Sequence, residues 1–169
     1  PGKYVYLNLG ASVEKRRWKV EHFIELASQI LKKTSWNIML GGGGPDDQKR
    51  SQAILNQLNS PRVSSDCIHS LMVSASIISQ AGLMVTSDTG AMHMGLSVKT
   101  PVVALFGTIS PTGSGPYDIA DHLCRVITIN PEGQDSFDVE NPGEYHIKSI
   151  TVNRVWEQVE KMLPNNSSP

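Results

Sequence analysis

The sequence has little of what marks a secreted, metal-binding or membrane-spanning protein. It contains 2 cysteines in 169 residues, Cys67 and Cys124, and neither has the partner of a C-x-x-C pair. A disulfide framework and a zinc site are therefore not indicated. No stretch approaches the ~20 consecutive apolar residues of a transmembrane helix. We expect a cytoplasmic protein that has at most peripheral contact with a membrane and binds no metal.

The sequence also lacks an excess of charge of either sign, and it does not begin with methionine. The 15 Lys and Arg residues nearly balance the 16 Asp and Glu residues, and the formal net charge is −1. Such a chain has no broad positive field for nucleic acid or an anionic membrane, so an anionic ligand must be held by a local cluster. The chain begins Pro-Gly-Lys, which indicates a cut from a longer protein or processing of its start.

The sequence does have a regular alternation of strand-like and helix-like segments. Residues 102–106 are continuously apolar, which is typical of a strand covered on both faces. The alternation predicts an α/β fold: a Rossmann-like, doubly wound parallel sheet of about six strands with helices on both faces. We expect one domain over residues 1–163 and a frayed tail over 164–169. The expected strands are 3–9, 36–40, 61–65, 82–87, 100–106 and 125–130, and the expected helices are 21–33, 46–58, 70–80, 89–98 and 151–163.

Four loops that follow the expected strands are rich in Gly, Pro, Ser and Thr: 10–17, 41–47, 87–90 and 107–117. In a doubly wound sheet such loops meet at the carboxyl edge, where ligands bind. The last of them, a long polar loop, either shapes a ligand pocket or is a structural turn.

The first loop carries three adjacent cations, Lys15, Arg16 and Arg17, directly before Trp18. Arginine forks and a lysine point charge together can neutralise a pyrophosphate. The alternative is a solvated charge run, which is the favoured interpretation of the motif taken alone. The position after a strand narrows that margin.

The second loop is a run of four glycines, 41–44, followed by Pro45, Asp46 and Asp47. It lacks the GK[ST] ending of a P-loop and the G-x-G-x-x-G spacing of a dinucleotide fold, so neither nucleoside triphosphate hydrolysis nor dinucleotide binding is supported. Asp46 or Asp47 accepts hydrogen bonds from ribose hydroxyls or caps the next helix, and taken alone capping is the expected role.

The third loop, Ser-Asp-Thr-Gly at 87–90, opens a helix directly after a strand. The free N–H groups at its start, on Thr89, Gly90 and the next residue, form an anion-binding end. Asp88 would repel a phosphate there, so we expect it to cap the helix or to accept a hydrogen bond from a sugar hydroxyl. His93, one turn in, either donates to a phosphate oxygen or is structural. Met92, Met94 and Leu96 are expected to pack beneath the helix.

Four segments, in this order, resemble glycosyltransferase family 9, the ADP-heptose:lipopolysaccharide heptosyltransferases: GAS…KRRW, LGGGGPDD, TSDTGAMHMGLSVKTPVVALFG and SPTGSGPY. The resemblance implies the C-terminal, donor-binding half of a GT-B fold, with ADP-heptose as the nucleotide-sugar donor. It also implies an N-terminal domain outside this chain that binds a lipid A–Kdo acceptor and supplies the catalytic base. Transfer would be inverting, with no metal and no cofactor, and the isolated chain would bind donor but transfer little.

The resemblance also assigns donor-binding residues, although no catalytic residue. Thr108 and Ile109 depart from the family pattern, which leaves the contacts of that loop open. Two other functions remain: a non-catalytic nucleotide-sugar binding module, and a GT-B enzyme such as a UDP-sugar transferase or epimerase. The predicted donor-binding residues are Lys15, Arg16, Arg17, Asp46 or Asp47, Asp88, Thr89, Gly90 and His93.

Overall fold

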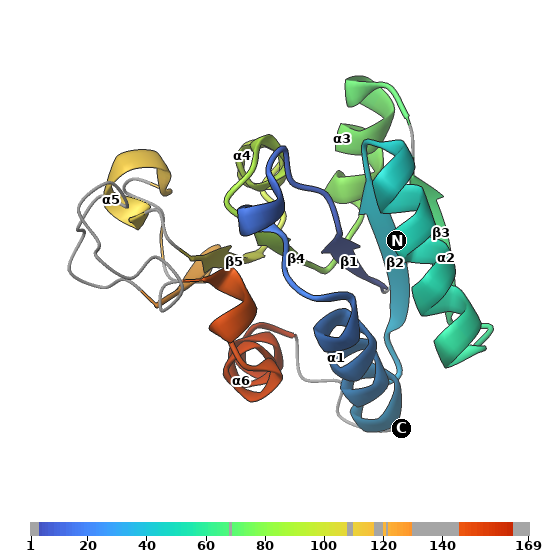
Figure 1. The fold of residues 1–169 in the computed structure, drawn as a ribbon. Helices are drawn as coiled ribbons and strands as arrows, with labels where there is room; N and C mark the ends of the chain where they lie inside the picture. The colour runs from blue at the N-terminus through green and yellow to red at the C-terminus, as the bar shows by residue number, and fades with distance from the viewer. Residues whose placement is uncertain are drawn as a thin grey trace.

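The computed structural model describes residues 4–67, 69–107, 110–116, 120, 122–129 and 146–163. Within these residues, six strands form one sheet in the order β3-β2-β1-β4-β5-β6, and every neighbouring pair is parallel (Figure 1). The predicted doubly wound α/β fold is confirmed. The strands are β1 (Tyr4–Asn8), β2 (Asn37–Gly42), β3 (Val63–Cys67), β4 (Leu83–Ser87), β5 (Val102–Phe106) and β6 (Cys124–Thr128).

Helices cover both faces of the sheet, as predicted. The cluster on one face joins apolar residues of α1 (Val20–Lys33), α2 (Pro45–Leu58) and α6 (Val152–Met162). The other face packs against α3 (Leu71–Ser79) and α4 (Gly90–Ser97). Three short elements were not predicted: η1 (Glu14–Arg16), α5 (Pro111–Ser114) and η2 (Ile147–Ser149). The predicted tail at 164–169 lies outside the described residues, as do 108–109 and 117 of the fourth loop.

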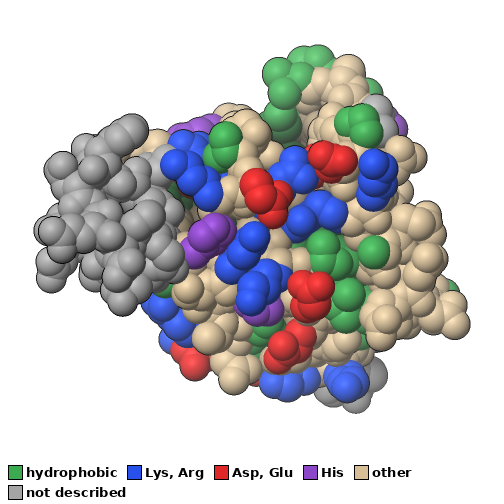
Figure 2. Space-filling model, in the orientation of Figure 1, with side chains coloured by type: hydrophobic (Ala, Val, Ile, Leu, Met, Phe, Trp, Pro, Cys, Tyr) green, Lys and Arg blue, Asp and Glu red, His purple; other side chains and the backbone are tan. Residues whose placement is uncertain are grey.

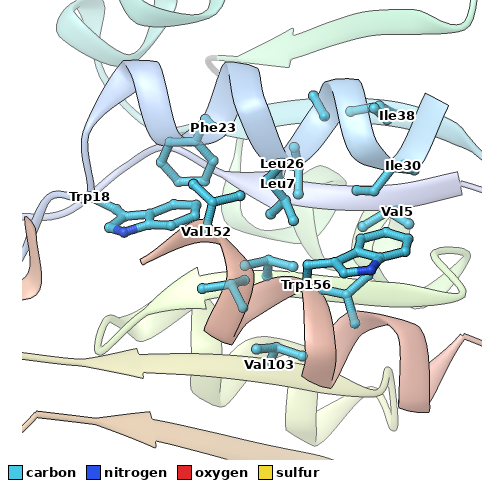
Figure 3. Packing of buried hydrophobic residues seen from close by; sticks show 14 of the residues in the cluster. Val5, Leu7, Trp18, Phe23, Leu26, Ile30, Ile38, Val103, Val152 and Trp156 are labelled. Carbon is cyan, nitrogen blue, oxygen red and sulfur yellow. The ribbon is translucent and has the colours of Figure 1, made fainter. Parts of the chain in front are cut away.

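The core follows from the two-residue alternation of the strands. In β1, Val5 and Leu7 face α1 and α6, whereas Tyr6 points to the α3 and α4 side. Strand β5 is buried over its whole length, as its continuous apolar run predicts. Figure 3 shows Trp18 and Trp156 packed among aliphatic side chains of α1, α6 and the sheet. Truncating a buried Trp in such a place costs about 3–5 kcal/mol.

The strand order reverses between β1 and β4, which is the topological switch point of the sheet. The ends of these two strands are tied together by Asn8, whose Nδ2 donates to Thr86 Oγ1 at 2.9 Å and to the Gly10 carbonyl at 3.1 Å. The loops that leave β1 and β4 therefore begin side by side. In the described part of the chain, no helix is both long and apolar enough to cross a membrane.

Candidate functional site

A cleft of about 380 Å³ opens at the carboxyl ends of β1 and β2, beside the start of α4. Because Thr89 and Ala91 of its wall follow β4, the cleft includes the switch point between β1 and β4. Its volume lies in the range of small-molecule sites. Three of the four predicted ligand-edge loops contribute to its walls, so the convergence of 10–17, 41–47 and 87–90 is confirmed. The lining residues are Asn8, Gly10, Ala11, Ser12, Arg17, Gly43, Gly44, Asp47, Thr89 and Ala91.

Trp18 anchors the first loop at the edge of this cleft. Its ring is 1 % exposed and lies edge-on to Phe23, with 5.0 Å between ring centroids. Its Nε1 donates to the Ile150 carbonyl at 2.9 Å, and its own carbonyl accepts from Arg50 at 2.5 Å. The three cations before Trp18 are consequently held beside the cleft. Lys15 is exposed, whereas the two arginines are half-buried, so the segment is more than a solvated charge run.

Arg16 and Asp88 form an ion pair between the first and third loops. Arg16 Nη1 lies 3.5 Å from Asp88 Oδ2 and 3.4 Å from the Asp88 carbonyl oxygen. Ser114, from α5, donates to the same Oδ2 at 3.1 Å. The N-cap of α4 is Thr89, so the prediction that Asp88 caps this helix is wrong. The carboxylate, whose side chain is 7 % exposed, joins η1, β4 and α5 instead.

Arg17 and Asp47 form a second ion pair, between the first loop and the glycine turn. Arg17 donates to the Ala11 carbonyl through Nε and Nη2, at 3.1 and 3.0 Å, and its Nη1 lies 3.4 Å from Asp47 Oδ1. Asp47 Oδ2 accepts from the N–H groups of Gly43 and Gly44 at 3.0 and 3.1 Å. Because Asp47 is the third residue of α2, this is the carboxylate half of a capping box. Asp47 therefore has the predicted capping role.

Asp46 lies elsewhere. Its side chain is 73 % exposed and pairs with Lys49 at 3.8 Å on the surface of α2. Asp46 is not among the residues that line the cleft. The structure thus separates the two aspartates that the sequence left as alternatives for a ribose contact: one lies on the surface, and the other is buried in the cleft wall.

Helix α4 presents its N-terminus to the cleft through Thr89 and Ala91. The first N–H groups of a helix have no partner within it, and with the helix dipole they attract an anion. Gly90 and His93 are both exposed on this helix, and His93 does not line the cleft. Met92 and Leu96 are buried, and the partly buried Met94 packs with them, which confirms the predicted packing role of this face.

A second cavity, of about 490 Å³, is larger but lies over the edge strand β6 and α6. None of the predicted site residues lines it, and it lies away from the switch point. Burial raises the pKa of the Cys124 thiol in its wall to about 11, so this thiol is protonated at neutral pH. We take the smaller cleft as the candidate site because loop backbone, a helix N-terminus and cations converge there. The larger cavity is lined by Pro116, Cys124, Arg125, Val126, Ile127, Arg154, Glu157 and Gln158.

Charges of both signs are interspersed over the face shown in Figure 2, in keeping with the net charge of −1. The described residues hold no cluster of three or more His, Cys, Asp or Glu side chains able to bind a metal ion. Sequence reasoning missed Asn8 and Ser114. Asn8 had a signal, since it ends a strand two residues before a glycine; Ser114 had none, because α5 has only four residues.

The family model and the curated relatives agree on one family. The model of glycosyltransferase family 9 (heptosyltransferase) matches residues 1–141. Lipopolysaccharide heptosyltransferase 2 of Salmonella typhimurium is 28 % identical over 155 residues, covering 88 % of this chain and 43 % of that protein. The curated relatives of this kind are matched over 43–52 % of their length, so the chain spans about half of them.

Two solved structures have the same fold. A family 9 glycosyl transferase from Veillonella parvula is 26 % identical with a TM-score of 0.80, over 96 % of this chain and 46 % of that one. The E. coli ADP-heptose LPS heptosyltransferase II is also 26 % identical, with a TM-score of 0.78 and the same coverage.

Proposed function

The chain belongs to glycosyltransferase family 9, and from this premise we propose that it is the donor-binding domain of a heptosyltransferase. Such an enzyme would transfer a heptose from ADP-heptose to the inner core of lipopolysaccharide, with inversion. The observation that carries the proposal is the cleft at the switch point. There a glycine turn and the N-terminus of α4 lie beside two arginines, each of which forms an ion pair with an aspartate. Similarity to lipopolysaccharide heptosyltransferase 2 and to the E. coli ADP-heptose LPS heptosyltransferase II supports this donor and this product.

We place the diphosphate of the donor at the N-terminus of α4. The N–H groups of Thr89 and Gly90 and the helix dipole attract the phosphates there. Arg16 supports this placement because its Nε is buried with no hydrogen-bond partner among the described residues, while Nη1 is held by Asp88. The exposed Lys15 adds positive charge at the same edge of the sheet. His93 approaches a phosphate oxygen from the exposed side of α4.

The nucleoside half of the donor then lies against the glycine turn, where the backbone of Gly43 and Gly44 forms the wall. Glycine allows a ligand to approach this backbone closely. Asp88 lies directly before Thr89, the N-cap of α4, between Arg16 and Ser114. We propose it as an acceptor for a sugar hydroxyl.

In the proposed reaction an acceptor hydroxyl attacks the anomeric carbon as the bond to the diphosphate oxygen breaks. Negative charge develops on the departing ADP, and preorganised cations and helix amides stabilise it without a metal. We propose that the general base and the lipid A–Kdo acceptor site belong to the part of the full protein outside this chain, and that the enzyme works at the cytoplasmic face of the membrane. The isolated chain is then expected to bind donor and to transfer little.

Calorimetric titration of the chain with ADP and with UDP tests this function. We expect one site that prefers ADP, and weaker ADP binding in His93→Ala. The control is His122→Ala, which removes an exposed histidine two residues before β6 and outside the cleft. Equal or tighter binding of UDP would indicate a UDP-sugar enzyme instead. Absence of nucleotide binding would refute a donor site, and ADP binding with no transfer by the full-length protein would indicate a binding module.

A further inference from the structure

The fourth loop, 107–117, brings one side chain to the ion pair beside the cleft. Ser114 Oγ donates to Asp88 Oδ2 at 3.1 Å, across 26 residues of sequence. Arg16 Nη1 lies 3.5 Å from the same oxygen. A neutral hydroxyl on α5 and a cation on η1 therefore hold the Asp88 carboxylate, whose side chain is 7 % exposed. The sequence left this loop open between a ligand pocket and a turn, and Ser114 is the residue that decides between them.

Helix α5 is a tight turn that carries this hydroxyl. A helix of four residues is not stable by itself, so α5 depends on contacts at its ends. At its start, the buried Ser110 accepts from the N–H of Thr112 at 3.2 Å. At its end, the N–H of Gly115 donates to the Pro111 carbonyl at 2.7 Å, and a Cβ added to Gly115 would lie 2.1 Å from that oxygen. These contacts fix the backbone from which Ser114 reaches Asp88.

The two contacts leave one oxygen of Asp88 for a ligand. Both contacts that the described residues make with the carboxylate fall on Oδ2, and none of them falls on Oδ1. An ionised carboxylate only accepts hydrogen bonds, so a partner of Oδ1 must bring an O–H or N–H group. A phosphate is anionic and is repelled by this oxygen, whereas sugar hydroxyls are neutral donors. The chemistry of Oδ1 therefore fits the sugar half of a nucleotide sugar.

The surroundings of the carboxylate have room for a sugar. Asp88 directly precedes Thr89, which is the N-cap of α4 and lines the cleft. A Cβ added to Gly90 or to Gly113 would meet no atom of the described residues within 4 Å. The start of α4 and the middle of α5 are therefore not closed by packing at these points. A sugar joined to a diphosphate at the N-terminus of α4 begins within reach of Asp88.

We propose that Ser114 is a positioning residue for the sugar half of the donor. Together with Arg16, its hydroxyl holds Oδ2 of Asp88, so that Oδ1 accepts a hydrogen bond from a sugar hydroxyl. A third of the Arg16 side chain is exposed, so the hydroxyl adds a directional contact to a partly screened ion pair. Ser114 then strengthens the binding of a nucleotide sugar and leaves the binding of ADP unchanged, because ADP carries no sugar beyond its diphosphate. The proposal rests on the proposed function in one respect, that the ligand of the cleft is a nucleotide sugar.

The test compares the dissociation constants for ADP-heptose and for ADP, measured by calorimetry on the 169-residue chain and on Ser114→Ala. The readout is the ratio of the two constants, because a merely structural defect would change both constants alike. We expect Ser114→Ala to weaken ADP-heptose binding about tenfold and to change ADP binding by less than about twofold. Ser114→Thr keeps the hydroxyl and should keep the ratio of the parent chain.

The matched control is Ser97→Ala, at the other end of α4. The Ser97 hydroxyl is exposed and donates to the Met94 carbonyl at 2.8 Å, so its removal should change neither constant. Asp88→Ala removes the carboxylate through which Ser114 is proposed to act. In the Asp88→Ala background, Ser114→Ala should therefore cause no further loss of ADP-heptose affinity.

Four results would overturn the proposal. Equal weakening of both ligands in Ser114→Ala would show that Ser114 supports the loop as a whole. An unchanged ratio in Ser114→Ala would show that the hydroxyl does not affect the sugar. A loss of the same size in Ser114→Thr would show that the hydroxyl is not the group that matters. Losses that multiply in the double variant would make Ser114 a contact of the sugar that is independent of Asp88.

A measurement without ligand tests the contact itself. The ¹³C signal of the Asp88 carboxyl should shift in Ser114→Ala, because the hydroxyl no longer donates to it, and an unchanged signal would refute the proposal. The titrations separate this proposal from the proposed function. If the parent chain binds neither ADP nor ADP-heptose, the proposed function fails and this proposal fails with it. If the parent chain binds both and the ratio does not respond to Ser114→Ala, only this proposal fails.

Discussion

The ion pair of Arg16 with Asp88 gives a prediction that separates folding from ligand binding. Replacing Arg16 by Met removes the cation and keeps most of the apolar stem. The carboxylate that remains is 7 % exposed and keeps the hydroxyl of Ser114 at 3.1 Å. Replacing Asp88 by Asn removes the charge and keeps an oxygen for that hydroxyl.

The expected magnitudes follow from the geometry. At the observed 3.5 Å, an effective dielectric constant of 20 gives an attraction of about 5 kcal/mol. Since a third of the Arg16 side chain is exposed, screening and desolvation reduce the net coupling to about 1–2 kcal/mol. We therefore expect Arg16→Met to lower the free energy of unfolding by about 2–3 kcal/mol, because it leaves a buried charge unpaired. In the Asp88→Asn background the same replacement should cost about 1 kcal/mol.

Urea unfolding of the four proteins, extrapolated linearly to water, measures the cycle. If the effects of the two substitutions add within about 0.5 kcal/mol, the scatter expected of independent sites, Arg16 and Asp88 are not coupled and the prediction fails. The affinity for ADP gives a second test, because the two substitutions should change it in opposite directions. Arg16→Met should weaken it, whereas Asp88→Asn should strengthen it a few-fold, since a negative charge beside the phosphates is lost and Arg16 is released. Weaker ADP binding in Asp88→Asn would contradict this placement of the diphosphate.

Three further predictions concern the rest of the chain. Arg62 donates to three backbone carbonyls in the last turn of α1 and in the segment before β2. Arg62→Ala should therefore lower the free energy of unfolding by about 3 kcal/mol in urea titrations; a change below about 1 kcal/mol would contradict this. Burial, with a smaller contribution from Lys19, lowers the pKa of His22; stability is therefore fully present above the unfolded pKa of about 6.5 and falls as the pH drops below it. His22→Gln should make this loss of stability at low pH smaller. An unchanged dependence of the free energy of unfolding on pH would contradict the prediction. At pH 8, iodoacetamide should label the half-buried Cys67 before Cys124, which is buried with a pKa of about 11; equal labelling by mass spectrometry would show that the β6 edge opens.

The fold was predictable because it follows from local patterns. The apolar run 102–106 predicts a strand buried on both faces, and β5 is buried throughout. The predicted and observed strand positions agree less well where the strand residues are polar. The third strand was expected at 61–65 and lies at Val63–Cys67. The sequence could not place its ends, because Ser64 and Ser65 are both exposed at the sheet edge and the strand shows no alternation of apolar and polar residues.

The sequence predicts which loops form the site, but not which of their charged side chains form ion pairs. The sequence places cations after β1 and carboxylates after β2 and β4, but it cannot tell that Arg17 contacts Asp47 and Arg16 contacts Asp88. Those pairings depend on how far apart neighbouring strands end and on which rotamers the long side chains adopt. Asp88 illustrates the limit: it precedes the N-cap Thr89, and its carboxylate contacts Arg16 and Ser114 of α5 and does not cap α4.

We propose that the nucleoside diphosphate binds in the cleft at the switch point and not in the larger cavity at β6. Titrating ADP into the ¹⁵N-labelled chain while following the backbone amide signals distinguishes the two places. We expect the largest signal changes at the cleft residues of 10–17, at Gly43 and Gly44, and at Thr89 to Ala91. Changes centred on 124–127 and 154–158, which line the larger cavity, would contradict it, as would no change at any amide.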